Sequence, residues 1–439
     1  MRLAVVGGGW AGLAAAVEAT SHGHAVTLFE MAPQLGGRAR RVDSGGLALD
    51  NGQHILIGAY TETLRLMRLV GADPQRLLWR MPLCLAFAEG GALVLPAGAP
   101  RLAFARAVLA RSGWRWRDRF ALLAATAGWA RRGFRCDARL TVAQLAAPLP
   151  ATVRADLIDP LCIAALNTPA PLASASVFLR VLHDALCSGA GAADLLLPRV
   201  DLSTLWPDAA AAWLARAGTQ LRIGHRVGQL KPHELGWQVD AEPFDMVVLA
   251  ATAVEAARLA EPIAPAWAGL ARALRHEPIV TVVLRSPGTR LPRPMLALNA
   301  SATAPAQFVF DLGPLRGSDG ALAFVISGAS AWVEQGMAAA TQATLAQARV
   351  ALGAHLRGPL QEVRTFTEKR ATLLCTPGLE RPSPRIADGL FAAGDYVAGP
   401  YPSTLEGAVR SGNGAVLALE AGAENALNGE RTAPPAARR

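Results

Sequence analysis

The 439 residues are 52% hydrophobic and 18% charged, and 43 Lys and Arg outnumber 34 Asp and Glu, which gives a net charge of +9. This composition excludes a disordered chain, and the length permits two or three domains with a large core. The five cysteines contain no C-x-x-C pair and the eight histidines no H-E-x-x-H. A disulfide scaffold and a zinc ribbon are therefore excluded as the organising element, and we expect no bound metal.

The first 20 residues predict a dinucleotide-binding unit. A short apolar strand over 3–6 leads into the glycine-rich turn 7–12, and an alanine-rich helix follows over 13–20. The three glycines of G-x-G-x-x-G allow a tight turn, a close approach of a pyrophosphate, and packing of helix on strand. The helix N-terminus then faces the phosphates. We assign to cofactor binding the residues Gly7, Gly9, Trp10, Ala11 and Gly12.

A second strand, predicted over 25–29, ends in Glu30. An acidic residue at this spacing accepts hydrogen bonds from both hydroxyls of an adenosine ribose. Glu30 therefore favours FAD or NAD over NADP.

Two further segments select FAD. The run 34–38, Gln-Leu-Gly-Gly-Arg, resembles the G-G-R extension of the glutathione-reductase-type flavoproteins, in the branch that holds amine oxidases and carotenoid desaturases. The resemblance implies that Gly37 and Arg38 lie against the FAD diphosphate. Near the other end of the chain, a buried strand is predicted to end in Gly394-Asp395. The same resemblance implies that Asp395 accepts a hydrogen bond from the ribityl chain.

The middle of the chain is expected to complete the cofactor domain. Three strands are predicted over 221–227, 236–239 and 244–252, with polar turns at Lys231-Pro232 and Glu242-Pro243. This meander resembles the second nucleotide-domain segment of the same flavoproteins, in which Val227 would offer its backbone to the adenine.

The predicted fold class is α/β: a discontinuous, glutathione-reductase-type (Rossmann-like) FAD-binding domain with an α+β substrate domain. The FAD-binding domain is assembled from residues 1–75, 205–265 and 385–425, and the substrate domain, which also faces the membrane, from 76–204 and 266–384. Residues 76–204 have a mostly helical pattern. The later piece has strands near 279–284, 307–310 and 322–326 and a helix near 332–352. A mobile tail is expected over 426–439.

A basic and aromatic segment spans residues 101–135. It holds nine arginines against one acid, Asp118, and tryptophans and other apolar residues alternate with the arginines. Arginine with tryptophan serves equally at a lipid headgroup layer and against nucleobases. Because the chain has a flavin signature and no recognisable nucleic-acid module, we favour a helix pair on a membrane surface over a solvated basic face. We expect no nucleic-acid partner.

The N-terminal segment and the number of cysteines indicate where in the cell the protein acts. The N-terminal apolar run is too short for the core of a signal peptide, and no other stretch is convincingly apolar for 18 residues. The odd number of cysteines fits a reducing compartment. We therefore expect a cytoplasmic protein that is peripheral on the inner face of the cell membrane.

Over nearly its whole length the sequence resembles the squalene-associated FAD-dependent desaturase family, whose members are described as hydroxysqualene dehydroxylases. The segments 50–54, Asp-Asn-Gly-Gln-His, and 401–407, Tyr-Pro-Ser-Thr-Leu-Glu-Gly, narrow the likeness to this family. The resemblance implies FAD as cofactor, an apolar C30 isoprenoid as substrate, and a place in squalene and hopanoid biosynthesis. It implies that an allylic alcohol is reduced to squalene by hydride transfer from N5 of reduced flavin to an allylic cation. The electron donor is not specified by the sequence.

Such a reaction needs a proton for the departing oxygen. His54 is the first candidate, because histidine titrates nearest neutrality and its loop is expected to return toward the flavin. The alternative for His54 is a structural role in holding that loop. Asp50 and Tyr401 are the competing proton donors.

The start of the C-terminal helix completes the predicted site. Thr404 and Leu405 are assigned to cofactor binding. Glu406 opens the helix, where the helix dipole stabilises a carboxylate, and it is assigned an architectural role.

Three alternative functions stay open. A carotenoid-type desaturase would run the hydride in the opposite direction on a similar polyene, and the sequence does not set the direction. A flavin amine oxidase shares both cofactor segments, but Thr404 occupies a position where those enzymes commonly carry an aromatic residue. A prenyl-lipid carrier on the same fold is the non-enzymatic alternative, although such escort proteins lack an intact FAD fingerprint.

Overall fold

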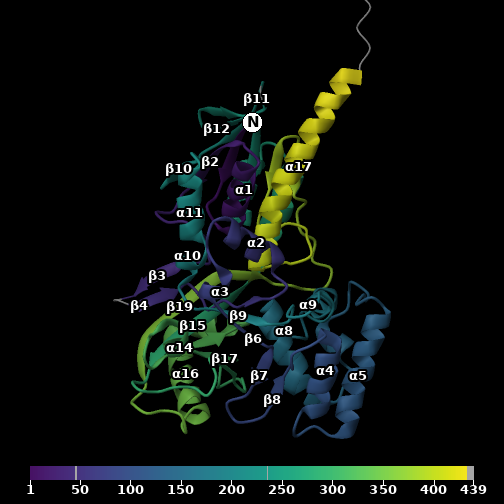
Figure 1. Cartoon of the computed structure of the whole chain (residues 1–439), viewed down its shortest axis with the longest axis vertical. Helices are drawn as coiled ribbons and strands as arrows, with labels where there is room; N and C mark the ends of the chain where they lie inside the picture. Colours follow the sequence, from purple (N-terminus) through teal and green to yellow (C-terminus); the bar gives the residue numbers. More distant parts are fainter. Residues whose placement is uncertain (45–46, 235, 433–439) are drawn as a thin grey trace, which may run out of the picture.

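A six-stranded sheet forms the centre of the upper part of the molecule (Figure 1). The computed structural model describes residues 1–44, 47–234 and 236–432. The strands follow the order β10 (Gln220–Ile223), β2 (Ala25–Glu30), β1 (Arg2–Val6), β14 (Met246–Leu249), β21 (Leu390–Ala392) and β20 (Arg385–Ala387). Neighbouring strands are parallel except β20 and β21, which pair antiparallel. The sheet thus joins segments from the start, the middle and the end of the chain.

Both faces of this sheet are covered, which explains why its inner strands β1, β14 and β21 are largely apolar runs. On one face, α1 (Trp10–Ser21), α11 (Pro207–Arg216) and α17 (Leu405–Thr432) share one apolar cluster with Val5 and Leu28. The other face carries a second apolar cluster. It is built from α12 (Ala253–Ala260), α13 (Pro265–Ala273) and a small antiparallel sheet of β11 (Leu230–His233), β12 (Gly236–Val239) and β13 (Glu242–Phe244).

Both predicted turns in the middle segment are wrong. Lys231-Pro232 lies inside β11 and Glu242-Pro243 lies inside β13. These two strands are the edges of their sheet, and an edge strand tolerates proline because its outward side needs no N–H donor. The strand expected over 221–227 ends at Ile223, and Gly224 follows with φ of +75°. The run 244–252 is also divided, since Phe244 ends β13 and the main-sheet strand β14 begins at Met246.

A five-stranded antiparallel sheet forms the base of the second domain. Its order is β16 (Met295–Ala297), β17 (Phe308–Asp311), β18 (Ala321–Ile326), β15 (His276–Arg285) and β19 (Gln361–Leu373). The accompanying helices are α14 (Leu312–Arg316), α15 (Ser330–Gln335) and α16 (Met337–Ala351). The three predicted strands are confirmed, and the single helix expected near 332–352 is divided into α15 and α16 by Gly336, which has φ of +97°.

Residues 76–204 are mostly helical, as predicted, and surround an apolar cluster of their own. The helices are α4 (Pro100–Ala110), α5 (Trp116–Arg131), α6 (Val142–Leu145), α7 (Ala151–Val153), a π-helical turn (Arg154–Ile158), α8 (Asp159–Leu166) and α9 (Ala175–Cys187). Short strands also occur there: β6 (Leu78–Met81), β7 (Cys84–Ala86), β8 (Ala92–Val94) and β9 (Leu195–Pro198).

The remaining short elements lie mostly at mid-height in Figure 1, between the two parts of the molecule. They are β3 (Arg41–Ser44), β4 (Leu47–Asp50), β5 (Leu56–Ile57), α2 (Thr61–Leu69), α3 (Pro74–Leu77) and α10 (Leu202–Leu205). The 50–54 segment begins at the last residue of β4 and continues in the loop to β5, so it runs along the junction of the two domains.

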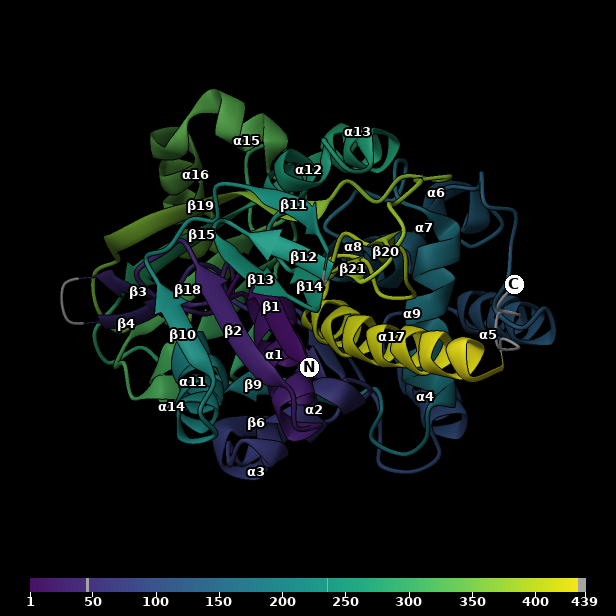
Figure 2. The same ribbon diagram turned by 90° about the horizontal axis from the view of Figure 1, so that it is seen from above.

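Two segments depart from the expected domain limits. Helix α13, which the expected limit at residue 266 assigns to the second domain, shares the apolar cluster of α12 and the small sheet. Residues 426–432 of the expected tail continue α17, which extends beyond the rest of the molecule in Figure 1 and is seen from above in Figure 2. The rest of that tail, 433–439, lies outside the described residues. Within the described ranges, no helix is long and apolar enough to cross a bilayer.

A buried carboxylate fastens α17 to α2. Glu406, in the first turn of α17, is 1% exposed and accepts hydrogen bonds from the N–H groups of Glu62 (3.0 Å) and Thr63 (2.9 Å). The Thr63 hydroxyl donates to the same carboxylate at 2.7 Å, and Arg410 pairs with it at 2.7 Å. Glu406 thus caps the N-terminus of α2, which is the architectural role that the sequence indicated.

We expect Glu406→Gln to lower the free energy of unfolding by about 2–4 kcal/mol, because two backbone donors and the partly exposed Arg410 guanidinium lose their charged acceptor. Urea unfolding of the FAD-free protein measures this loss. Glu62→Gln is the control, since the Glu62 carboxylate pairs with Arg65 near the surface and its loss should cost less than about 1 kcal/mol. Equal losses in the two variants would contradict the capping role.

Candidate active site

A cavity of about 490 Å³ opens where the parallel strands of the main sheet end. Gly7 follows β1, Glu30 ends β2, Ala250 follows β14, Gly394 follows β21, and all four line the cavity. The carboxyl edge of a parallel sheet is where folds of this class bind their ligands. The second domain supplies part of the wall through β15 and β19.

Two of the three glycines of the motif, Gly7 and Gly12, leave no room for a side chain. Gly7 has φ of +114°, and a Cβ there would lie 2.5 Å from the carbonyl oxygen of Ala250. A Cβ on Gly12 would lie 1.8 Å from the carbonyl oxygen of Gly7, so the first turn of α1 packs directly on the end of β1. Gly9 lines the cavity, and a Cβ there would come no closer than 3.7 Å to Gly37. This is a cradle in which a diphosphate can reach the backbone.

Glu30 is buried beside this turn. Its Oε2 accepts from the Gly8 N–H at 2.6 Å, and its Oε1 accepts from the Ala32 N–H at 2.7 Å. Each carboxylate oxygen has a second lone pair, so both can still accept a ribose hydroxyl. The predicted chemistry of Glu30 therefore fits its place in the cavity.

The two ends of the chain meet at an ion pair across the cavity. Arg38 Nη2 lies 2.5 Å from Asp395 Oδ1, although the two residues are 357 positions apart. The second terminal nitrogen of Arg38 donates to the carbonyls of Arg370 (2.7 Å) and Ala371 (3.1 Å) on β19. Arg38 thus connects the G-G-R segment, the Gly-Asp segment and the second domain.

The predicted cofactor residues lie together, with one exception. Twelve line the cavity: Gly7, Gly9, Trp10, Ala11, Glu30, Gly37, Arg38, Val227, Gly394, Asp395, Thr404 and Leu405. Gly12 is packed behind the turn, against Gly7. Trp10 is itself held in place, because its indole N–H donates to the Ala39 carbonyl at 2.9 Å and its ring packs on Trp206.

Of the three predicted proton donors, His54 lines the cavity. Its Nδ1 lies 2.9 Å from the Gly52 carbonyl oxygen. A carbonyl can only accept, so Nδ1 carries the hydrogen and Nε2 is the nitrogen that can exchange a proton. Burial lowers the pKa of His54 below its ordinary value, although the Gly52 carbonyl and nearby Asp50 oppose the shift.

Asp50 and Tyr401 are placed elsewhere. Asp50 is buried in an ion pair with Arg316 (2.5 Å), and it also accepts from the Leu202 N–H at 2.8 Å. Burial raises the pKa of Asp50, while Arg316 lowers it. Neither Asp50 nor Tyr401 lines the main cavity, and Tyr401 borders a neighbouring cavity of about 380 Å³.

Sequence reasoning missed the polar cavity residues of the second domain: His276 on β15, and Glu368 and Arg370 on β19. Glu368 is held by Asn51, whose Nδ2 donates to it at 2.8 Å. Burial lowers the pKa of His276. The one available signal was the two-residue spacing of Glu368 and Arg370, which places them on the same face of a strand.

The cavity lies at the edge of a parallel sheet and is closed by a second domain. A glycine turn follows the first strand, an acid ends the second, and Gly-Asp follows a later one. This combination defines a dinucleotide-binding oxidoreductase. Residues 10–419 match the family described as flavin containing amine oxidoreductase, so the chain belongs to that family. It is an FAD-dependent oxidoreductase, and the cradle, Glu30 and the Arg38–Asp395 pair fit that cofactor.

Two relatives match the chain from end to end. It is 30% identical over 452 residues to the hydroxysqualene dehydroxylase of Rhodopseudomonas palustris, with 95% of this chain and 98% of that protein covered. It is 27% identical over 458 residues to the hydroxysqualene dehydroxylase of Sinorhizobium fredii, covering 94% and 97%. The zeta-carotene desaturase of Zea mays is 40% identical over 74 residues, which are 17% of this chain and 13% of that protein.

Solved structures share the fold. An oxidoreductase from Methanosarcina mazei superposes with a TM-score of 0.76 at 14% identity, covering 95% of this chain and 100% of that one. Cyclohexylamine oxidase from Brevibacterium oxydans superposes with a TM-score of 0.67 at 17% identity, covering 96% and 99%. At these identities the likeness establishes the architecture alone.

We expect Gly12→Ala to abolish most FAD binding, because the added methyl cannot fit 1.8 Å from the Gly7 carbonyl and must push α1 away from β1. The flavin content of the purified protein, read from its visible absorption, measures the effect. Gly269→Ala in α13 is the matched control, since a Cβ there meets no atom within 4 Å and alanine favours a helix. A Gly12→Ala protein with full flavin content would contradict the close-packing argument.

Proposed function

We propose that this enzyme reduces hydroxysqualene, a hydroxylated C30 isoprenoid, to squalene in squalene and hopanoid biosynthesis. The observation that carries the proposal is the end-to-end likeness to two proteins named hydroxysqualene dehydroxylase. The likeness to the zeta-carotene desaturase of Zea mays extends over only 74 residues, which favours dehydroxylation over desaturation. An amine oxidase is disfavoured because Thr404, and not an aromatic residue, borders the cavity at the start of α17.

The proposed reaction balances with one hydride and one proton. Bound FAD, in its reduced form, supplies the hydride. The allylic carbon–oxygen bond of the substrate breaks, the hydroxyl leaves as water after it takes a proton, and the carbon gains the hydride. The reducing equivalents come from a two-electron donor. The protein itself must hold the polyene, exclude water and deliver the proton.

We propose that the predicted cofactor residues divide the FAD molecule among them. The glycine turn receives the diphosphate on backbone N–H groups at the start of α1. Glu30 accepts the hydroxyls of the adenosine ribose, and Val227 borders the adenine. Arg38 and Asp395 serve the diphosphate and the ribityl chain, respectively.

His54 is the residue that we propose delivers the proton. When protonated, its Nε2–H can be given to the departing oxygen, and the ring then returns to the tautomer that the Gly52 carbonyl already holds. The lowered pKa makes protonated His54 a stronger acid. It also reduces the fraction of His54 that is protonated at neutral pH. The rate of dehydroxylation should therefore rise as the pH falls toward and below the ordinary histidine value.

The decisive experiment mixes anaerobic, dithionite-reduced enzyme with hydroxysqualene in detergent. We expect the flavin absorption to return and squalene to accumulate in equal amount. His54→Phe should retain bound FAD, reoxidise at least about tenfold more slowly and lose the rise in rate at low pH. Reduction of the oxidised enzyme by a primary amine, with no reaction of hydroxysqualene, would refute the proposal.

We also propose that the enzyme is cytoplasmic and binds the inner face of the cell membrane through α4 and α5. Leu102, Trp116 and Phe120 are exposed by 62%, 61% and 60%. The rings of Trp116 and Phe120 stack at 5.9 Å, and the Arg119 guanidinium lies 4.7 Å from the Trp116 ring centre. Exposed aromatic side chains among arginines suit an interface with anionic headgroups. A membrane-bound enzyme would meet its water-insoluble substrate there.

The other tryptophans of this segment belong to the core. Trp114 is 5% exposed and donates to Asp156 at 2.8 Å, and Trp129 is 4% exposed. They are therefore unavailable to a membrane, and substituting Trp114 would destabilise the helical part.

We expect the double variant Trp116→Ser, Phe120→Ser to bind vesicles containing phosphatidylglycerol at least about tenfold more weakly, since two large apolar side chains no longer enter the interface. Co-sedimentation of the FAD-loaded protein measures the binding. Val350→Ser is the control, because Val350 is 86% exposed on the distant helix α16. Unchanged co-sedimentation of the double variant would exclude this surface.

A further inference from the structure

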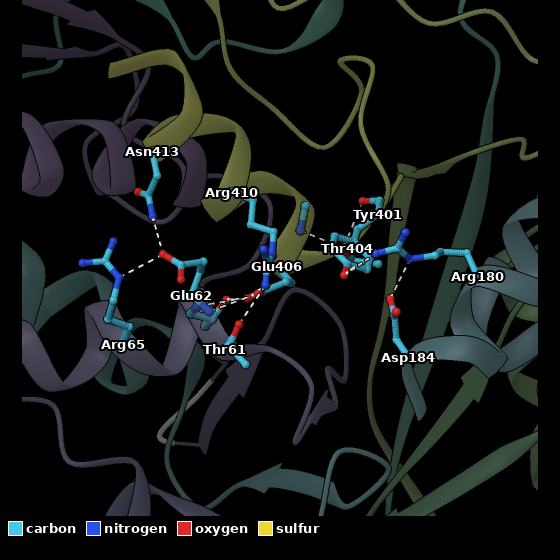
Figure 3. A network of polar contacts seen from close by, with 12 residues as sticks. Thr61, Glu62, Arg65, Arg180, Asp184, Tyr401, Thr404, Glu406, Arg410 and Asn413 are labelled. Carbon is cyan, nitrogen blue, oxygen red and sulfur yellow. Dashed lines mark hydrogen bonds and ion pairs between the residues drawn. The ribbon is translucent and has the colours of Figure 1, made fainter. Parts of the chain in front are cut away.

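A tyrosine ring at the junction of the two domains is held between two arginines (Figure 3). The guanidinium carbons of Arg180, on α9, and Arg410, on α17, lie 5.2 Å and 5.3 Å from the ring centre of Tyr401. Arg180 Nη2 also donates to the Tyr401 hydroxyl at 3.1 Å. A guanidinium near an aromatic ring, with a hydrogen bond to its hydroxyl, restricts the tyrosine in position and in rotation.

Each arginine is in turn anchored in its own domain. Arg180 Nε donates at 3.0 Å to Asp184, which is 5% exposed and lies on the same helix of the second domain. Arg410 donates to Glu406 at 2.7 Å and to the Thr61 hydroxyl at 2.7 Å. The three side chains of Arg180, Tyr401 and Arg410 therefore connect α9, which lies in the apolar cluster of the substrate domain, with the cofactor domain.

The backbone of Tyr401 supports the first turn of α17. Its carbonyl accepts from the Thr404 hydroxyl at 3.1 Å, and the Thr404 oxygen accepts from the Gly407 N–H at 2.8 Å. A Cβ on Gly407 would lie 1.9 Å from the Tyr401 carbonyl oxygen, so the turn is packed directly on Tyr401. Any displacement of the Tyr401 backbone must therefore displace the beginning of α17.

The same turn borders the cofactor cavity. Ser403, Thr404 and Leu405 line it. Ser403 has φ of +57°, a left-handed conformation that costs a non-glycine residue about 1–2 kcal/mol and persists only where neighbours hold it. Its N–H donates to the Asp395 carbonyl at 3.0 Å, and its hydroxyl accepts from the Leu373 N–H at 2.8 Å.

We propose that Arg180 is a positioning residue: it clamps Tyr401 from the substrate domain and, through Tyr401, sets the first turn of α17 against FAD. Tyr401 is then not a proton donor but the contact through which the second domain acts on the cofactor. Ligand-driven movement of α9 would reach the cavity by this route. The proposal rests on FAD binding and is independent of the substrate.

The test is Arg180→Lys in the full-length, FAD-loaded protein. Lysine keeps the charge but loses the planar group that packs on the ring. We expect the dissociation constant of FAD to rise about three- to tenfold, in line with the loss of one cation–π contact and one hydrogen bond. The visible absorption band of the bound flavin should shift. Its reduction potential should become more negative, because the positive end of α17 would withdraw from a cofactor that gains negative charge on reduction.

Arg199→Lys is the matched control. The Arg199 guanidinium lies 5.8 Å from the ring centre of Trp79, so this variant removes the same kind of contact at another place in the substrate domain. It should leave FAD affinity, spectrum and potential unchanged. Equal values for wild-type, Arg180→Lys and Arg199→Lys proteins would overturn the proposal.

A double-mutant cycle checks that Arg180 acts through the tyrosine. In a Tyr401→Leu background, Arg180→Lys should change the FAD dissociation constant no further, because the two side chains work as a unit. An undiminished effect in that background would overturn the assigned route. None of these measurements requires hydroxysqualene, so failure of the dehydroxylase proposal would leave the test intact, and the reverse is also true.

Discussion

The parallel register of four strands is the constraint on which the whole site depends. Val6 pairs with Phe29 on one side and with Leu249 on the other, and Leu249 pairs with Ala392. Residues from three distant parts of the chain therefore end in one row, and the next few positions along each strand reach the same edge. The hydrogen-bonded register of the strands brings their carboxyl ends to one edge of the sheet. The glycine turn, Glu30 and the Gly-Asp segment therefore line one cavity.

Close backbone packing fixes the helices to that row. The first turn of α1 rests on Gly7 through Gly12, and α17 rests on α1 in the same manner. A Cβ on Gly412 of α17 would lie 2.2 Å from the carbonyl oxygen of Ala11. Such contacts admit no side chain and leave little freedom, so the two helices that begin at the cavity are positioned by backbone geometry. Glu406 and Tyr401 then tie the beginning of α17 to α2 and to the second domain.

The loop that carries His54 is held by charges from both domains. Asp50, at the end of β4, forms a buried ion pair with Arg316 of the second domain, and Asn51 holds Glu368 on β19. The side chains of Asp50 and Asn51 thus make structural contacts, whereas His54, a few residues later, lines the cavity. A buried ion pair adds little net stability but is costly to break, so this junction favours a defined orientation of the loop over flexibility.

The sequence by itself determined the cofactor class and predicted residues that the structure places around one cavity, because the glycine spacing, Glu30, the G-G-R run and Gly-Asp each reflect local backbone geometry or local chemistry. It also determined three strands of the five-stranded sheet, β15, β17 and β18, whose apolar runs are regular, but not the polar strand β19. Only the tertiary structure decided which of His54, Asp50 and Tyr401 borders the cavity, and that Glu368 and His276 join it, because these placements depend on contacts between residues far apart in the chain. The two prolines that were read as turns lie on edge strands for the same reason: whether a proline is tolerated depends on the neighbouring strand, which local sequence does not contain.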